Sequence, residues 1–199
     1  VDISSNGSAG DFDVSKISKD LLPLAQAVTH GEASSFDAWY GHGNGAKLPN
    51  IGKLPTECSI KEIMQNESAR IRATGGSAIG IYQFIPSTLA AICKVSKIST
   101  DEIFSPEIQN TLFRRGYLST SGLRPSIGKY LQGDKNNQSN LSLAMQACAK
   151  EWASVEWSEN CVGTGNIYAK YRSNNKLGTK ASQVKDGLLA QWDFERQNK

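Results

Sequence analysis

The segment Ala78-Ile79-Gly80-Ile81-Tyr82-Gln83-Phe84-Ile85-Pro86-Ser87-Thr88 carries the pattern that decides the fold. Its glycine, Gly80, allows another part of the backbone to approach closely. The segment leads into Pro86, which is favoured in the first turn of a helix because its missing N–H donor is not needed there. The sequence therefore predicts a close backbone approach at Gly80 and a helix that begins at Pro86.

Two side chains in this segment are suited to binding a sugar. Tyr82 offers a flat apolar surface with a hydroxyl group, and Gln83 offers a donor and an acceptor for sugar hydroxyls or N-acetyl groups. The alternative is that Tyr82, Phe84 and Ile85 belong to the core, while Gln83 satisfies a buried carbonyl. Both interpretations stay open at the level of the sequence.

Outward from this segment the signals are mostly helical, with no internal repeat and no pattern of parallel strands. Ser59-Ile60-Lys61-Glu62 is a capping box, and Ser105-Pro106-Glu107 has proline at the first helical position. The glycine-rich stretch Trp39–Pro55 has little periodicity, which favours a long irregular segment or a small β-hairpin. Helices are expected over 21–31, 59–69, 126–131, 141–155 and 184–194, and from Pro86 and Pro106 onward.

Length and composition indicate one folded domain. A chain of 199 residues, 39% of them hydrophobic, can bury a substantial core. We expect a flexible tail or linker remnant over residues 1–13 and a single domain over residues 14–199. The net charge of +3 is small and the basic residues are scattered, so the stripe of a nucleic-acid-binding protein is missing. No apolar run is long enough to span a membrane.

The four cysteines are Cys58, Cys93, Cys148 and Cys161. They show no C-x-x-C spacing and no adjacent histidine pair, so no metal site is expected. The even count is compatible with two disulfides in an oxidising compartment, and the alternative is four reduced, buried thiols. A cysteine hydrolase that pairs Cys58 or Cys93 with a histidine is a further hypothesis, with His30 or His42 as its base.

A candidate catalytic acid lies in Thr29-His30-Gly31-Glu32-Ala33-Ser34-Ser35-Phe36-Asp37-Ala38-Trp39-Tyr40. Glu32 stands where an apolar helix gives way to a glycine and an aromatic-rich loop. An apolar wall raises the pKa of a carboxyl group, which can keep Glu32 protonated for donation to a leaving oxygen. The alternative is a solvated residue at a helix end. Asp37 is the nominated second carboxylate, and it can face the same cleft only if the helix ends between the two.

Three segments together resemble the lysozyme-like superfamily of peptidoglycan-cleaving enzymes. Gly80–Thr88 resembles the G-L-x-Q-x-x-P-x-T signature of lytic transglycosylases and the G-x-Y-Q-F-I-P segment of phage endolysins. Gly31-Glu32 is similar to the catalytic glutamate position at the end of the superfamily's first core helix. Ala149–Val155 is similar to the W-A-S segment of lambda-type endolysins. The three matches occur in the family's order along the chain.

The resemblance implies a mainly α, lysozyme-like fold of the α+β kind, with two lobes and a glycan cleft between them. It also implies cleavage of the β-1,4 bond between N-acetylmuramic acid and N-acetylglucosamine in bacterial peptidoglycan, without a metal or organic cofactor. Glu32, Tyr82 and Gln83 carry over as family residues, whereas Asp37 lies outside the invariant signature. Trp39 and Tyr40 join them as candidate substrate-binding residues, because they lie in the glycine-rich loop after Glu32.

The chemistry at this bond stays open. With a second carboxylate to activate water, the enzyme is a muramidase, that is, a glycoside hydrolase. Without one, the muramic 6-hydroxyl can attack the anomeric carbon and leave a 1,6-anhydro end, the lytic transglycosylase outcome. The Tyr-Gln-Phe form of the signature resembles endolysins and favours hydrolysis. A non-catalytic peptidoglycan-binding module is the third hypothesis.

The expected place of action is the periplasm or the cell wall, reached by export, injection or phage lysis. A phage lysis protein, a secreted antibacterial effector and a cell-wall remodelling enzyme all fit, and an effector would add an immunity protein as a partner. The expected partner otherwise is the peptidoglycan glycan strand. We expect a monomer that binds no nucleic acid and does not insert stably into a membrane.

Overall fold

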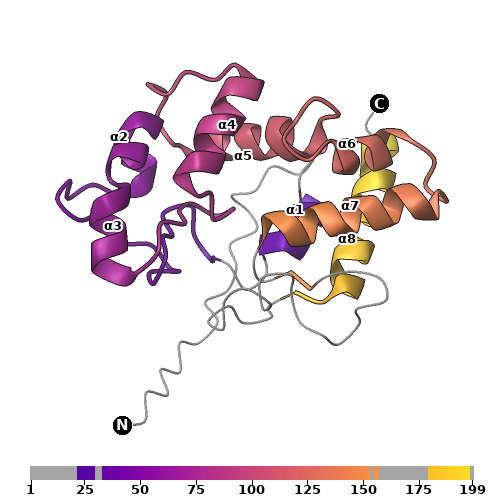
Figure 1. Cartoon of the computed structure of the whole chain (residues 1–199), viewed down its shortest axis with the longest axis horizontal. Helices are drawn as coiled ribbons and strands as arrows, with labels where there is room; N and C mark the ends of the chain where they lie inside the picture. The colour runs from indigo at the N-terminus through magenta and orange to yellow at the C-terminus, as the bar shows by residue number, and fades with distance from the viewer. Residues whose placement is uncertain (1–21, 30–32, 153–154, 157–178, 198–199) are drawn as a thin grey trace, which may run out of the picture.

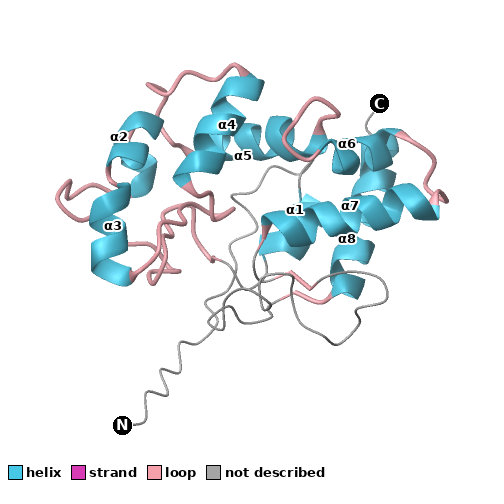
Figure 2. Ribbon diagram, viewed as in Figure 1, coloured by secondary structure: helices cyan, strands magenta, loops and turns pink. Residues whose placement is uncertain are grey.

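The computed structural model describes residues 22–29, 33–152, 155–156 and 179–197, and these ranges fold mainly into helices without a β-sheet (Figure 1, Figure 2). The prediction of a mainly α protein is confirmed, while the predicted tail over residues 1–13 lies outside the described ranges. The elements are α1 (Leu22–Thr29), η2 (a 3-10 turn, Pro55–Glu57), α2 (Ile60–Gln65), α3 (Glu67–Thr74), α4 (Pro86–Ser96), α5 (Pro106–Phe113), η3 (a π-helix, Arg114–Leu118), α6 (Pro125–Gln132), α7 (Gln138–Glu151) and α8 (Ala181–Gln197).

Local signals start several helices as predicted. The Ser59 hydroxyl accepts the backbone N–H of Glu62 at 3.1 Å, and the Glu62 carboxylate accepts the N–H of Ser59 at 2.7 Å. This is the expected capping box, and it opens α2. α4 begins at Pro86 and α5 at Pro106, where the Ser105 hydroxyl forms the N-terminal cap.

The helix predicted over 59–69 is two helices. Asn66 ends α2 and immediately precedes α3, which runs on to Thr74. Gly75 then ends α3 with a left-handed backbone at φ 86°, a conformation that glycine adopts without steric cost. The prediction did not anticipate the interruption at Asn66 or the continuation of the helical segment to Thr74.

The helix predicted over 141–155 starts and ends earlier. α7 begins at Gln138 because the Asn137 side chain caps it, and it ends at Glu151. Trp152 leaves the helix with an extended backbone and is buried. The aromatic side chain therefore leaves the helical path and enters the core.

The glycine-rich stretch from Trp39 to Pro55 was expected to be either a long irregular segment or a small β-hairpin, and it is an irregular segment. Trp39 and His42 form a single antiparallel bridge, and no strands follow from it. Turn hydrogen bonds close the rest of the segment, such as the one from the Leu48 N–H to the Lys53 carbonyl at 2.8 Å.

The helices form two groups along the long axis of the molecule (Figure 1). α2 and α3 lie at one end, while α6, α7 and α8 lie at the other with α1 beside them. α4 and α5 connect the groups, and α5 continues directly into η3. α1 packs along α8, and α6 packs along α7, so the chain's first described helix is held by its last.

The contact between α1 and α8 depends on Gly187. A Cβ atom at this position would lie 2.6 Å from the Cβ of Ala27 and 3.1 Å from the Pro23 carbonyl oxygen. Neither neighbour is the end of a flexible side chain, so neither can move aside. Gly187 therefore sets how closely α1 approaches α8.

Gly187→Val is expected to lower the free energy of unfolding by about 1–3 kcal/mol, the usual effect of overpacking, although valine favours helix more than glycine does. Urea unfolding followed by circular dichroism measures the change. Gly43→Val is the matched control, because no atom lies within 4 Å of a Cβ at Gly43. Equal stabilities of the two variants would contradict the tight α1–α8 contact.

An aromatic cluster forms the centre of the core. Tyr82 stacks on Phe113 with ring centroids 4.3 Å apart, and Trp152 meets Tyr117 edge to face at 4.9 Å. Phe84 lies 5.7 Å from Tyr82 and is likewise buried. The segment 78–88 thus supplies two rings to a cluster shared with α5, η3 and the end of α7.

Of the two alternatives for the cysteines, two disulfides are contradicted. Two disulfides would pair all four cysteines, whereas Cys58, Cys93 and Cys148 are buried free thiols. Burial raises the pKa of each of these thiols, and the Glu62 carboxylate raises that of Cys58 further. A buried thiol that holds its proton is a poor nucleophile, which argues against the cysteine hydrolase hypothesis. Cys161 lies outside the described residues.

Among the described helices, none combines the length and the apolar composition needed to cross a membrane.

Candidate functional site

The loop after α1 pairs directly with the segment that precedes α4. The Tyr40 N–H donates to the Ala78 carbonyl at 2.9 Å, and the Gly80 N–H donates to the Ala38 carbonyl at 2.7 Å. Trp39 and Ile79 form the antiparallel bridge between these bonds. Residues 38–40 and 78–80 are therefore side by side, although some forty residues separate them in the chain.

A tight turn follows at Gly80–Gln83. Ile79 and Phe84 exchange backbone hydrogen bonds of 2.9 and 2.8 Å across it, and Gly80 has a φ of 77°. Gln83 also has a positive φ, 51°, which is uncommon for a residue with a side chain. A Cβ at Gly80 would lie 2.5 Å from the side-chain oxygen of Gln109, so the group that needs the space at this glycine is a side chain rather than the predicted backbone.

The side chain of Gln83 braces this turn. Its amide nitrogen donates to the Gly80 carbonyl at 2.8 Å. This contact agrees with the second interpretation of Gln83, in which its side chain satisfies a buried carbonyl. The other amide atom, Oε1, has no hydrogen-bond partner among the described residues, and the side chain is partly exposed. Gln83 can therefore still accept a hydrogen bond from a ligand.

Gln109 on α5 holds the turn and the loop together. Its side chain is fully buried, and its Oε1 accepts the Ile81 N–H at 3.0 Å. Its Nε2 donates to the Phe36 carbonyl at 3.0 Å and to the Phe104 carbonyl at 3.1 Å. Sequence analysis did not single out Gln109, because one glutamine in a helix of mixed composition carries no signal of burial.

Tyr82 lies in the core rather than on a surface. Its side chain is 1% exposed, and its hydroxyl donates to Asn110 Oδ1 at 2.6 Å. In this position the ring has no face open to a sugar, which agrees with the core interpretation of Tyr82. Its backbone carbonyl accepts the indole N–H of Trp152 at 3.1 Å, and this bond joins the family-like segments 80–88 and 149–155.

Of the two aromatic residues proposed for the cleft, Trp39 is buried and Tyr40 is open. Trp39 is 3% exposed, donates its indole N–H to the Ala46 carbonyl at 3.1 Å and packs against the His42 ring. Tyr40 is 45% exposed, and its ring covers Gly76, where a Cβ would lie 2.3 Å from the ring. Trp39 thus shapes the loop, while Tyr40 presents a ring face beside it.

Asp37 has a structural contact. Its Oδ1 accepts the Thr56 N–H at 2.8 Å, and Gly45 packs closely enough that a Cβ there would lie 2.9 Å from the Asp37 Cβ. One carboxylate oxygen thus ties the loop to η2, which leaves the other oxygen for chemistry. Glu32 lies outside the described residues, between the buried Thr29 at the end of α1 and Ser34, whose N–H donates to the Gly43 carbonyl.

Glu151, next to Trp152, is held in an ion pair. Its Oε2 accepts from the Arg124 guanidinium at 2.8 Å, and its Oε1 accepts the Tyr117 hydroxyl at 2.7 Å. Burial raises the pKa of Tyr117 well above its ordinary value, and the Glu151 charge adds to this effect. Tyr117 therefore stays a neutral donor, and the end of α7 is fixed where Trp152 contacts Tyr82.

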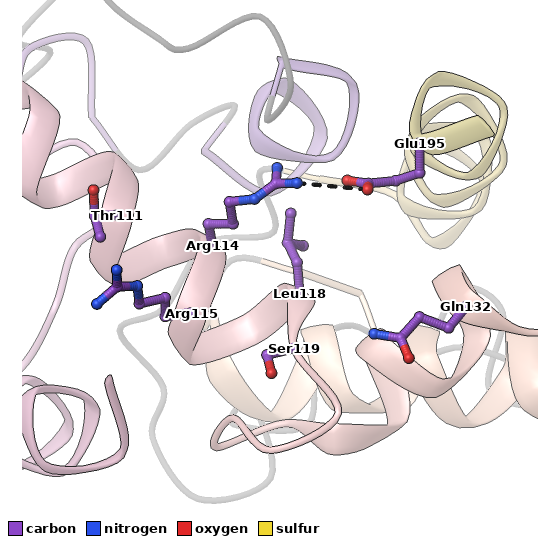
Figure 3. Close-up of a pocket in the computed structure, with 7 residues that line it drawn as sticks. All are labelled: Thr111, Arg114, Arg115, Leu118, Ser119, Gln132 and Glu195. Atoms are coloured by element: carbon purple, nitrogen blue, oxygen red, sulfur yellow. Dashed lines mark ion pairs between the residues drawn. The ribbon is translucent and has the colours of Figure 1, made fainter. Parts of the chain in front are cut away.

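A hollow of about 520 Å³ lies elsewhere, between η3, α6 and α8 (Figure 3). Arg114 points toward Glu195, with which it pairs at 3.6 Å, and Arg115 donates to the Ser96 carbonyl at 3.0 Å. These arginines connect helices to one another, so the hollow offers weak grounds for a site. Among the described residues, no three His, Cys, Asp or Glu side chains gather as metal ligands.

No protein-family model matches the chain, and comparisons with curated proteins and with solved structures find no significant match.

Gln109→Leu is expected to lower the free energy of unfolding by about 3 kcal/mol or more, because the buried Ile81 N–H and two carbonyls lose their partner. Thermal and urea unfolding measure the loss. Gln132→Leu, on the exposed end of α6, is the control and should change stability by less than about 0.5 kcal/mol. A Gln109 variant as stable as this control would show that the amide does not hold the loop.

Asp37→Asn separates a structural carboxylate from a catalytic one. Asparagine keeps an oxygen that can accept the Thr56 N–H, so the fold should survive. If the chain has the peptidoglycan-cleaving activity that the family resemblance implies, and Asp37 only ties the loop to η2, the cleavage rate should stay within about twofold of wild type. If Asp37 activates water, kcat should fall by roughly 10²–10⁴-fold, the usual contribution of a general base. Turbidity loss of a cell-wall suspension measures the rate.

Proposed function

We propose that this protein is a peptidoglycan muramidase of the lysozyme-like kind. It cleaves the β-1,4 bond between N-acetylmuramic acid and N-acetylglucosamine, and Glu32 is the general acid that protonates the leaving oxygen. The substrate is the glycan strand, and the place of action is the periplasm or the cell wall. The proposed cleft runs along the paired 38–40 and 78–80 segments, between the two groups of helices, which are the two lobes.

One observation carries the proposal: two of the three family-like segments, 80–88 and 149–155, belong to a single bonded unit that also includes residues 38–40. The loop after α1 pairs with 78–80, and the Trp152 indole bonds to the Tyr82 carbonyl at 3.1 Å. Neither contact is a consequence of chain proximity. A chance likeness of two separate segments to one family would give no reason for them to be in contact, so the Trp152–Tyr82 contact supports a common role.

The open surface of this unit has groups that suit a sugar. The half-exposed ring of Tyr40 offers a flat apolar face, and the free Oε1 of Gln83 can accept a hydroxyl or an N-acetyl N–H. Sugars commonly place an apolar ring face on an aromatic side chain and their hydroxyls on nearby amides. In the proposal these two side chains replace the buried Tyr82 and Trp39 as the groups that touch the glycan.

A lytic transglycosylase is the second candidate, and the contact of Asp37 favours it. One oxygen of the Asp37 carboxylate already accepts the Thr56 N–H, so only the other oxygen is left to activate water. In that mechanism the muramic 6-hydroxyl attacks instead, and Glu32 first donates and then accepts the proton. Both candidates break the same bond with the same acid. If the protein acts as an effector, an immunity protein would be its further partner.

Mass spectrometry of the muropeptides released from purified peptidoglycan tests the proposal. Wild type is expected to release reducing ends, and Glu32→Gln should lower release by roughly 10²-fold or more, because glutamine cannot donate the proton. Products that carry 1,6-anhydro ends and depend equally on Glu32 would identify a transglycosylase.

Glu102→Gln, the same change at an exposed carboxylate, is the matched control and should leave release unchanged. Equal release by Glu32→Gln and Glu102→Gln would refute Glu32 as the acid. Binding to peptidoglycan without release of products from wild type would leave the non-catalytic binding module as the function.

A further inference from the structure

The peptide group between Tyr82 and Gln83 is held at both of its polar ends. Its carbonyl, on Tyr82, accepts the indole N–H of Trp152 at 3.1 Å. Its N–H, on Gln83, donates to the Gly80 carbonyl at 3.1 Å. A peptide group is planar, so hydrogen bonds on opposite edges fix the orientation of the whole plane. That orientation in turn sets the φ angle of Gln83.

This orientation gives Gln83 a backbone conformation that residues with a side chain disfavour. Its φ of 51° lies in the left-handed region, where the Cβ atom approaches the backbone too closely. A flip of the 82–83 peptide plane would return Gln83 to a negative φ, and it would break both hydrogen bonds. The Trp152 indole therefore opposes the relaxation of Gln83.

The left-handed backbone decides where the Gln83 side chain points. In this conformation its Nε2 reaches back to the Gly80 carbonyl at 2.8 Å, and its Oε1 has no partner among the described residues. This oxygen is the acceptor that the proposed function assigns to the glycan. A change of φ at Gln83 would turn its Cβ and carry the amide away from this place.

Trp152 itself has little freedom to move. It is 2% exposed, and its ring centroid lies 4.9 Å from that of Tyr117 and 5.9 Å from that of Phe113. The carboxylate of the preceding residue, Glu151, accepts the Tyr117 hydroxyl at 2.7 Å and the Arg124 guanidinium at 2.8 Å. The indole N–H is thus a fixed donor whose position depends on α7 and η3 rather than on the turn.

We infer that Trp152 is a positioning residue for glycan recognition: its indole N–H holds the 82–83 peptide so that the Gln83 amide is presented to the substrate. Trp152 acts through Gln83, because its own side chain is buried. The inference rests on the proposed function for the identity of the ligand, and it gives the 149–155 segment a role at the site. It requires that the effects of Trp152 and Gln83 on cleavage be coupled.

Hydrogen exchange of the Gln83 amide tests the positioning without a cleavage assay. Trp152→Phe removes the indole N–H and keeps an aromatic ring, so the Gln83 N–H should exchange about twofold to tenfold faster, as expected for one lost hydrogen bond. Trp192→Phe is the matched control, because the Trp192 indole also donates to a backbone carbonyl, that of Gly133, at 3.0 Å. It should leave exchange at Gln83 unchanged.

A second variant covers the case in which Trp152→Phe does not fold. In Trp152→benzothienylalanine a sulfur atom replaces the indole N–H in a ring of nearly the same size, so the donor is lost with little change in packing. Unchanged exchange at Gln83 in a folded variant would overturn the inference. An equal acceleration of Gln83 and of the protected amides of α4 would also overturn it, because the effect would then be a general loss of stability.

A double-mutant cycle on cleavage asks whether Trp152 acts through Gln83. Trp152→Phe should lower kcat/KM for glycan strands by about threefold to tenfold, mainly by raising KM, because Gln83 binds the sugar and moves no proton. Gln83→Gly removes the amide and keeps a positive φ without strain. Adding Trp152→Phe to Gln83→Gly should therefore change kcat/KM by less than about twofold.

The two experiments keep the possible failures apart. An undiminished effect of Trp152→Phe in the Gln83→Gly background would overturn the positioning role while the proposed function stands. If wild type releases no muropeptides, the proposed function fails, and hydrogen exchange at Gln83 still decides whether Trp152 holds the 82–83 peptide.

Discussion

The buried amide of Gln109 is the contact on which the arrangement of the candidate site depends. The Gln109 side chain on α5 forms hydrogen bonds with Phe36 in the loop, with Ile81 in the turn and with Phe104 just before its own helix. In a region without a β-sheet, these backbone groups have no ladder to satisfy them, and leaving them unpaired would be costly. Gly80 must lack a side chain because the same amide oxygen occupies the space that a Cβ would need.

This arrangement explains why an irregular loop can be positioned accurately. The loop after α1 is rich in glycine and polar residues, so fixing its shape without outside contacts would cost a large conformational entropy. Its order comes from partners distant in sequence: the 78–80 segment, Gln109, and the Thr56 N–H that bonds to Asp37. The strained backbone of Gln83 is supported in the same way, since its own side chain returns to the Gly80 carbonyl.

Much of the fold was predictable because its signals are local. The capping box at Ser59 and the prolines at 86 and 106 act within one helical turn, and the helices start there. The features that the sequence did not predict depend on partners that are distant in the chain. Burial of Tyr82 and Trp39 follows from rings and carbonyls elsewhere in the chain, and Gln109 has no local signature at all. The exposure of Tyr40 could not be separated from the burial of Trp39, its neighbour, by composition alone.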